Sequence, residues 1–140
     1  MRKTLISVTA ILAAGAGAAV AEEVRVYNWS DYIDESLLTK FEEETGYELI
    51  YDVFDSNEVL ETKLLAGGSG YDVVVPSGTF LARQIQAGAF QKLDYDMLPN
   101  AEHLWDVIRE RTEAYDPGHE YSVNYMWGTT GIGVNVDEVR

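Results

Sequence analysis

Strand-like and helix-like segments alternate from Val24 to Gly88, and this alternation is the feature that most restricts the fold. The strand patterns are short and rich in β-branched and aromatic residues, whereas the helix patterns repeat apolar residues every three or four positions. The predicted strands cover residues 24–27, 47–54 and 72–75; the predicted helices cover residues 34–45, a segment capped by Ser56 or Asn57 and ended by Gly67, and residues 79–87. This order predicts an α/β fold in which helices cover both faces of a parallel sheet.

The connections that follow the three strands are expected to meet at one edge of the sheet. They hold Trp29 to Tyr32 after the first strand, Asp55 to Asn57 after the second and Pro76 to Thr79 after the third. Parallel strands end at the same edge, and α/β proteins bind ligands in the crevice beyond those ends. The alternation alone therefore predicts a binding edge built from these three loops.

The third strand, residues 72–75, is continuously apolar, which is typical of a strand buried on both faces.

The alternation of strand-like and helix-like segments is weaker after Gly88. Further along, the sequence predicts a helix over residues 104–111, a turn at 116–118, extended segments at 121–126 and 130–136, and the start of a helix at 137–139. We expect this last helix to continue beyond Arg140, so the chain is predicted to be part of a longer protein.

Residues 1–21 have the pattern of a cleaved export signal. Arg2 and Lys3 precede an uncharged apolar stretch, and Ala19 and Ala21 fit the small-x-small pattern for cleavage before Glu22. The alternative, a membrane-spanning helix, is disfavoured because the apolar run is shorter than the roughly 20 residues that a span needs. We therefore expect an exported protein.

Charge and cysteine content restrict the partners further. Removal of residues 1–21 leaves eight basic residues against 24 acidic ones, a net charge of −16, which disfavours nucleic acid and anionic membrane surfaces. The acidity is compatible with cationic ligands, although a solvated acidic surface explains it as well. The absence of cysteine excludes disulfides and a lipid-bearing cysteine, so we expect a protein without a membrane anchor.

Four motifs, taken together, resemble one protein family. They are VYNWSDYI at residues 26–33, YDVFDSNEVLE at 51–61 followed by Lys63 and Leu64, YDVVVPS at 71–77, and YMWGTTGIGVN at 125–135. In this order they are similar to the periplasmic polyamine-binding proteins, the receptors of putrescine and spermidine ABC importers. The resemblance covers nearly all of the chain after residue 21.

The resemblance implies a type II periplasmic-binding-protein-like receptor with two α/β lobes that close over the ligand by a hinge. Residues 22–126 would form an incomplete first lobe and residues 127–140 the hinge and the start of a second lobe, most of which is absent from this chain. The implied partners are a polyamine, with putrescine favoured, and the membrane permease of an ABC importer. The implied protein is a periplasmic monomer without a cofactor.

The resemblance also implies a ligand site. Trp29 would form an aromatic wall, Ser30 and Asp31 would meet one end of the amine, and Tyr32 would complete that corner. Ser77 would add a polar contact, and the small side chain of Thr79 favours putrescine over a longer ligand. The residue types suit the ligand, because a carboxylate is the natural partner of an ammonium group and aromatic faces attract cations while packing against methylenes.

Structural explanations of the same residues remain open. Trp29 and Tyr32 could be core aromatics, Asp31 could be a turn residue or a helix cap, and Ser77 could cap the third helix. His103 and His119 lack metal-ligand spacing and are predicted to lie on the surface.

Two other functions also remain open. A periplasmic hydrolase that uses acidic residues is disfavoured because the sequence contains no nucleophile motif and no metal cluster. A shortened gene product without tight binding is the other alternative. We expect a binding protein and not an enzyme.

Overall fold

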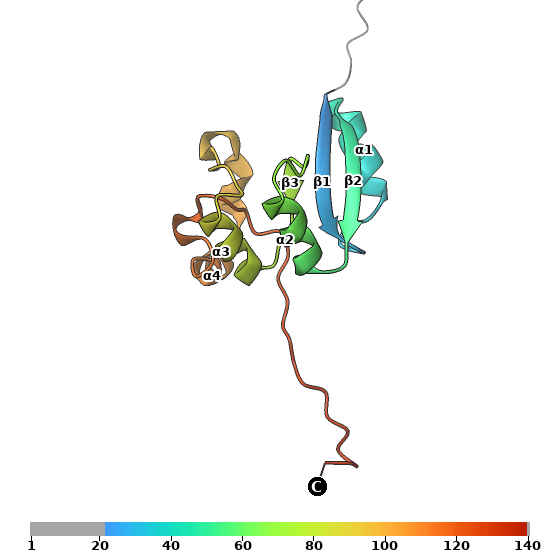
Figure 1. Ribbon diagram of the computed structural model, residues 1–140, viewed down its shortest axis with the longest axis vertical. Helices are drawn as coiled ribbons and strands as arrows, with labels where there is room; N and C mark the ends of the chain where they lie inside the picture. The colour runs from blue at the N-terminus through green and yellow to red at the C-terminus, as the bar shows by residue number, and fades with distance from the viewer. Residues whose placement is uncertain (1–21, 140) are drawn as a thin grey trace, which may run out of the picture.

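The computed structural model describes residues 22–139, so the predicted signal peptide at residues 1–21 lies outside the described residues. Three strands and four α-helices follow one another in the predicted order, and short 3-10 turns flank the last helix (Figure 1). The elements are β1 (Glu23–Trp29), α1 (Ser36–Thr45), β2 (Glu48–Phe54), α2 (Asn57–Leu65), β3 (Val73–Val74), α3 (Gly78–Gln86), η1 (Tyr95–Met97), η2 (Pro99–His103), α4 (Asp106–Thr112) and η3 (Pro117–His119).

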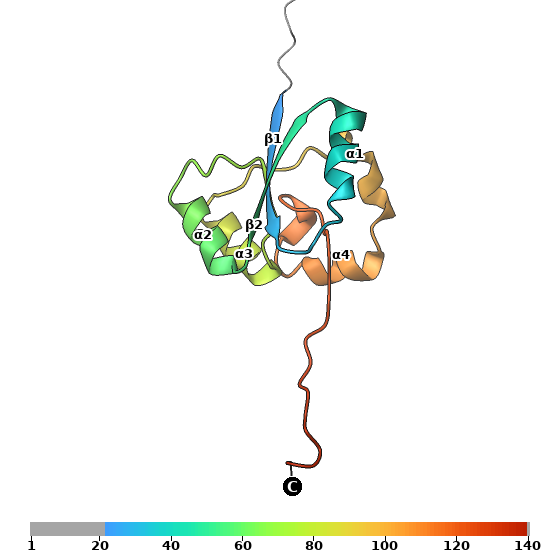
Figure 2. The same cartoon turned by 90° about the vertical axis from the view of Figure 1, so that its right-hand side faces the viewer.

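The three strands form one parallel sheet in the order β2-β1-β3. The central residue Val26 is paired with Tyr51 on one side and with Val73 on the other. The chain leaves β1 toward β2 and then returns across β1 to β3, so two right-handed crossovers place their helices on opposite faces. Figures 1 and 2 show this arrangement, with α1 on one side of the sheet and α2 with α3 on the other. The predicted parallel α/β fold with helices on both faces is confirmed.

The predicted helix ends are largely correct. The Ser56 hydroxyl accepts a hydrogen bond from the Val59 backbone N–H at 3.3 Å, as expected of the cap of α2. Gly46 ends α1 in a left-handed conformation with φ 76°, and its N–H donates to the Glu42 carbonyl. Helix α1 begins at Ser36 and not at Asp34, because the Asp34 carboxylate accepts from the Ser36 backbone N–H at 2.9 Å. Hydrogen bonds from Ser36 hold the pKa of Asp34 below its usual value.

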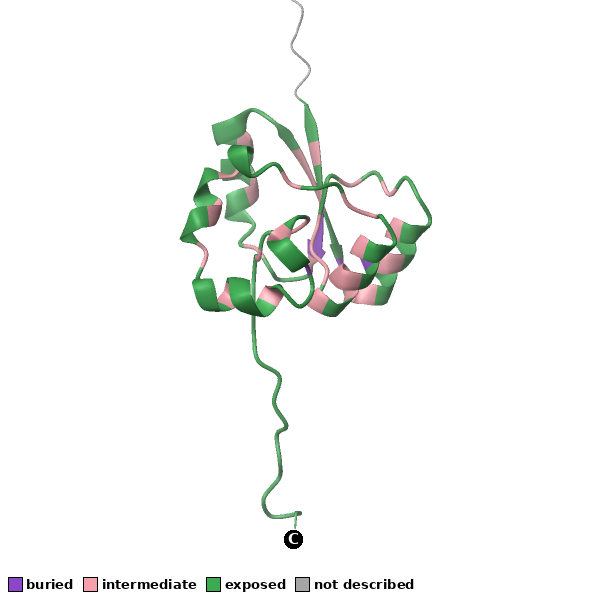
Figure 3. Cartoon of the chain, turned by 90° about the vertical axis from the view of Figure 1, so that its left-hand side faces the viewer, coloured by how far each residue is buried: buried purple, intermediate pink, exposed green. Residues whose placement is uncertain are grey.

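The core lies between the sheet and α2. Tyr27, Phe54 and Leu60 are buried, and Trp29, Leu64, Tyr71 and Val74 pack against them. The Tyr27 ring stacks on Tyr71 at 4.5 Å between centroids and meets the edge of Phe54 at 4.9 Å. Figure 3 shows buried residues at the carboxyl end of β1, which places the best-packed region directly behind the predicted binding edge.

The predicted burial of β3 on both faces is wrong. The strand is shorter than expected, and Val73 is 49% exposed, whereas Val74 packs against the core. Strand β3 is an edge strand of this sheet, and Val73 faces the α1 side because it is paired with Val26. Helix α1 packs on β2 at the opposite edge, and no other helix within residues 22–139 covers Val73.

The segments predicted to be extended near the C-terminus form no strand in the described part of the chain. Residues 121–126 and 130–136 are irregular, and most of this region runs away from the domain (Figure 1). An extended pattern becomes a strand only where a neighbouring strand satisfies its backbone groups, and the described sheet offers none here. The predicted helix start at 137–139 is a single turn, in which the N–H groups of Glu138 and Val139 donate to the Asn135 carbonyl.

A lysine from α2 joins the helix to the sheet through two tyrosines. The Lys63 ammonium donates to the Tyr71 hydroxyl at 3.0 Å, and that hydroxyl donates to Asp52 at 2.7 Å. The ammonium also lies 4.6 Å from the ring centroid of Tyr27 and 4.9 Å from that of Tyr71. The hydrogen bond to Tyr71 raises the pKa of Lys63, and the nearby tyrosines and Asp52 add to the effect.

We expect the contribution of Lys63 to stability to depend on pH. Because its pKa is higher in the folded state than the ordinary value of 10.5, the contribution is complete below that value and is lost as the pH rises through the folded pKa. In urea unfolding at pH values of about 7, 9 and 11, Lys63→Met should lower the midpoint at the first two pH values and have a smaller effect at the third. Lys40→Met is the control, since Lys40 forms only an exposed pair with Glu44. A constant effect of Lys63→Met across this range would contradict the prediction.

Candidate ligand-binding site

Trp29 is the last residue of β1, and hydrogen bonds fix both its backbone and its side chain. Its indole N–H donates to the Val75 carbonyl at 2.9 Å, and its backbone N–H donates to the Asn28 side chain at 2.8 Å. Its ring lies 4.7 Å from Phe54 and 6.0 Å from Tyr32, measured between centroids. The indole is half-buried, so one part packs on the core and the rest faces solvent at the strand-end edge.

Asp31 follows in a left-handed conformation, with φ 61°. This region is open to aspartate and asparagine at low cost, and it presents the side chain on a sharp turn. The Asp31 carboxylate is exposed and makes no hydrogen bond or ion pair with any other residue in the range 22–139. The cap alternative for Asp31 is therefore wrong, because Asp34 accepts the hydrogen bond at the start of α1.

Backbone contacts hold the rest of the first loop. The Ser30 N–H donates to the Phe54 carbonyl at 3.2 Å, which ties the loop to the end of β2. The hydroxyl of Tyr125 donates to the Tyr32 carbonyl, so the segment that leaves the domain passes directly across this loop. Tyr32 itself is exposed, with its ring tilted toward Trp29.

The second and third loops are joined by a pair of hydrogen bonds. The Asn57 amide donates to the Ser77 hydroxyl at 3.0 Å, and its oxygen accepts from the Ser77 backbone N–H at 2.9 Å. Ser77 stands at the N-terminus of α3, but its side chain makes no capping hydrogen bond. Thr79 lies exposed in the first turn of the same helix.

All three predicted loops thus meet at one edge, which confirms the convergence expected from the strand order. The first loop contacts the third through Trp29 and Val75, and the second contacts the third through Asn57 and Ser77. The sequence placed Asn57 in the second converging loop and as a possible helix cap, but did not indicate its pairing with Ser77. No local signal indicated it, since the pairing joins positions 20 residues apart.

A hydrogen bond between Asn28 and Tyr51 stabilises the end of β1, from which the first loop begins. Asn28, which is 3% exposed, donates to the Tyr51 hydroxyl at 2.8 Å while accepting from the Trp29 N–H. Burial raises the pKa of Tyr51, the hydrogen bond from Asn28 opposes the rise, and the proximity of Tyr125 adds to it. The hydroxyl therefore stays protonated through the physiological range and fixes the strand end from which Trp29 projects.

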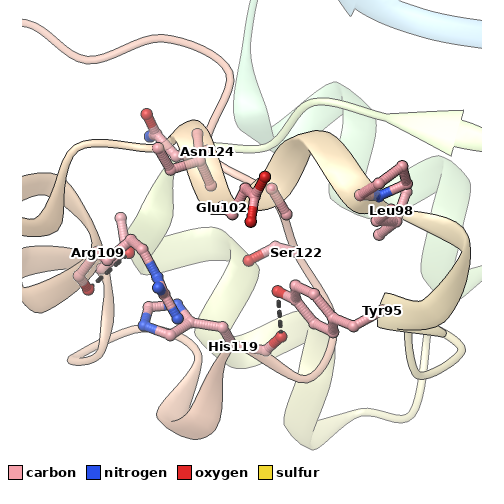
Figure 4. A pocket seen from close by; sticks show the side chains of 11 residues that line it. Tyr95, Leu98, Glu102, Arg109, His119, Ser122 and Asn124 are labelled. Atoms are coloured by element: carbon pink, nitrogen blue, oxygen red, sulfur yellow. Dashed lines mark hydrogen bonds between the residues drawn. The ribbon is translucent and has the colours of Figure 1, made fainter.

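One cavity of about 340 Å³ lies between η1 with η2 and the α4–η3 segment (Figure 4). Its lining is mixed, and none of the six predicted site residues takes part. The lining includes Tyr95, Leu98, Glu102, Arg109, His119, Ser122 and Asn124.

His119 corrects one prediction. Its side chain is only 16% exposed and lies 3.1 Å from Glu113, so the expected surface position is wrong for His119 and correct for His103. Within the described range 22–139, no group of three or more acidic or histidine side chains is arranged to hold a metal ion. The same residues contain no helix of the length and apolarity needed to cross a membrane.

A parallel α/β unit with aromatic and acidic groups beyond its strand ends offers a ligand site at the edge where open α/β sheets bind their ligands. No family model matches the chain. It is 55% identical over 140 residues to the putrescine-binding periplasmic protein SpuD of Pseudomonas aeruginosa strain UCBPP-PA14, a match that covers 99% of this chain and 38% of SpuD. It is 49% identical over 133 residues to the putrescine-binding periplasmic protein PotF of Escherichia coli K12, with 94% of this chain and 36% of PotF covered.

The fold also matches a solved structure of a protein with a similar name. The spermidine/putrescine ABC transporter substrate-binding protein PotD of Streptococcus pneumoniae matches 77% of this chain with a TM-score of 0.73 and 37% identity, and the match covers 33% of PotD. The predicted resemblance to periplasmic polyamine-binding proteins is confirmed, and so is the fold of a single lobe. The chain spans a little over a third of the length of SpuD and PotF.

Proposed function

We propose that this chain is part of a periplasmic receptor that captures a polyamine, with putrescine preferred, and delivers it to the permease of an ABC importer. The observation that carries the proposal is the exposed carboxylate of Asp31, which has no partner among residues 22–139 and follows Trp29 at the edge where three loops meet. The names of the relatives support the ligand class and the compartment.

The arrangement of side chains suits one end of a diamine. Each ammonium group donates up to three hydrogen bonds and loses water on entry, so a fixed carboxylate compensates for the lost hydration. Asp31 would take this role, with the Ser30 and Ser77 hydroxyls as further acceptors. The exposed parts of Trp29 and Tyr32 would pack against the methylenes and attract the cation, a contribution of about 0.5–2 kcal/mol. The small side chain of Thr79 would favour putrescine over a longer ligand, as the resemblance implies.

The proposed boundaries follow from the same arrangement. Residues 1–21 would be a cleaved signal peptide, residues 22–126 would belong to the first lobe, and residues 127–140 would form the hinge and enter a second lobe. The contact from Tyr125 to Tyr32 supports this division, because it places the departing segment at the ligand edge. Ligand would shift the population from open to closed lobes, and the receptor would act as a monomer without catalysis.

The test is amine binding by the protein expressed from its complete coding sequence. We expect putrescine to raise the melting temperature, because a ligand that binds only the folded state stabilises it by mass action. Calorimetric titrations with putrescine, cadaverine, agmatine and spermidine would then rank the amines, with putrescine expected to bind most tightly. The uncharged analogue 1,4-butanediol is the control. Binding of the diol as tight as that of putrescine, or no response to any amine, would refute the proposal.

A further inference from the structure

Gly78 opens α3, and its backbone does not explain why a glycine is there. Its φ is not in the positive range that favours glycine, unlike that of Gly46 or Gly88. A Cβ atom at this position would lie 2.6, 2.8 and 2.9 Å from the Cδ2, Cε2 and Cγ atoms of Tyr115. Distances below 3.0 Å are not compatible with a real side chain, so the missing side chain makes room for the tyrosine ring. Gly78 is therefore required for the close approach of Tyr115.

Tyr115 reaches this position from a distant part of the chain. It follows α4, where its backbone N–H donates to the Thr112 carbonyl at 2.9 Å, and α4 lies at the same end of the molecule as the strand arrowheads (Figures 1 and 2). The residue is 37% exposed, and its hydroxyl makes no hydrogen bond within residues 22–139. A large aromatic ring with a free polar end thus stands directly on the third loop.

The contact between Tyr115 and Gly78 lies within the part of the third loop that belongs to the proposed amine site. Ser77 and Thr79 flank the glycine, and both belong to the proposed amine site. Ser77 and Thr79 have small hydroxyl side chains and Gly78 has none, so the three residues occupy little volume. The Asn57–Ser77 hydrogen bonds fix the loop beneath them. The ring of Tyr115 lies against this part of the third loop.

We propose that Tyr115 is a specificity-determining residue of the amine site, an aromatic wall that closes the third-loop side and favours short diamines over longer polyamines. The inference rests on the proposed function. An aromatic face next to a ligand chain packs against methylenes and attracts an ammonium group, and a rigid wall excludes a ligand that extends past it. Because Gly78 has no side chain, the Tyr115 ring can approach the backbone of the third loop closely.

The ratio of two affinities tests the proposal. We would titrate the protein expressed from its complete coding sequence with putrescine and spermidine, as wild type and as Tyr115→Ala, Tyr115→Leu and Tyr115→Phe. Replacement by alanine or leucine is expected to shift the ratio toward spermidine by about fivefold or more, and phenylalanine is expected to leave it unchanged. A purely structural role would weaken both ligands together, so the ratio separates the two roles.

Gly78→Ala provides an independent arm. Its Cβ would displace the Tyr115 ring, so the ratio is expected to shift in the same direction without any change to the tyrosine itself. In the double variant with Tyr115→Ala, the added methyl group should have no further effect, which is the non-additivity of residues in contact.

Two results would overturn the inference, and they are distinguishable. An unchanged ratio in both Tyr115→Ala and Tyr115→Leu, with putrescine bound by wild type, would remove Tyr115 from the site and leave the proposed function intact. Tyr115→Leu decides the matter if Tyr115→Ala fails to fold, because it keeps an apolar side chain on the glycine. Absence of amine binding by the wild type would instead refute the proposed function, and the inference with it.

Discussion

Replacing Asp31 with alanine is expected to weaken putrescine binding by at least about tenfold. A hydrogen bond to a charged group contributes roughly 1.5–3 kcal/mol, which corresponds to about tenfold to 150-fold in affinity. The Asp31 carboxylate has no hydrogen-bond partner in the described part of the chain, so its removal should lower the affinity for the ligand without removing a contact within the fold. Isothermal titration of the variant against putrescine measures the effect.

Asparagine separates the charge of Asp31 from its backbone. Alanine at φ 61° adds strain of about 1 kcal/mol or more, whereas asparagine tolerates the left-handed region. Asp31→Asn should therefore keep the melting temperature and still lose most of the affinity. Asp55→Asn removes one exposed charge from the same edge and is expected to weaken binding by less than about threefold, because an exposed charge that does not contact the ligand is weakened by solvent and salt. Equal losses in the two asparagine variants would assign the effect to the general acidity of the edge and exclude Asp31 as the ligand group.

The fold was predictable because hydrophobic period and turn residues are local signals. The alternation from Val24 to Gly88 yielded the parallel sheet, and the ends of its strands yielded the three converging loops. Ser56 as a cap and Gly46 as a helix stop were recognisable for the same reason, since each acts on neighbours in the sequence.

The errors have a common physical origin, which is that burial depends on distant partners. A run of three valines is typical of a doubly covered strand, yet β3 lies at an edge where one face has no helix over it in the described residues. The contact between Gly78 and Tyr115 and the pairing of Asn57 with Ser77 join residues far apart in the sequence, so neither leaves a periodic signal. The aromatic and acidic residues of the site were visible, but the contacts that hold them were not.

Asp116 is the clearest case of a residue whose importance only the structure reveals. In the sequence it is the first residue of an Asp-Pro-Gly turn, but in the fold it is 1% exposed. One carboxylate oxygen accepts from the Glu120 N–H at 3.2 Å. The other accepts from the Tyr121 and Ser122 N–H groups at 3.0 and 2.8 Å and from the Ser122 hydroxyl at 2.8 Å. A single buried side chain thus holds the segment that leads to Tyr125 and the ligand edge.

Asp116→Ala is consequently expected to destabilise the fold by about 2–4 kcal/mol, because it leaves three backbone donors without an acceptor in a partly buried position. Urea unfolding measures the loss, and hydrogen exchange localises it, with faster exchange expected at the amides of Glu120, Tyr121 and Ser122. Ser122→Ala is the matched control, since it removes the hydroxyl bond alone and should cost about 1 kcal/mol. Asp116→Asn should fall between the two, because an amide keeps one acceptor oxygen and turns its NH2 group toward donors. Unchanged exchange at these three amides in Asp116→Ala would show that the turn holds its shape without the carboxylate.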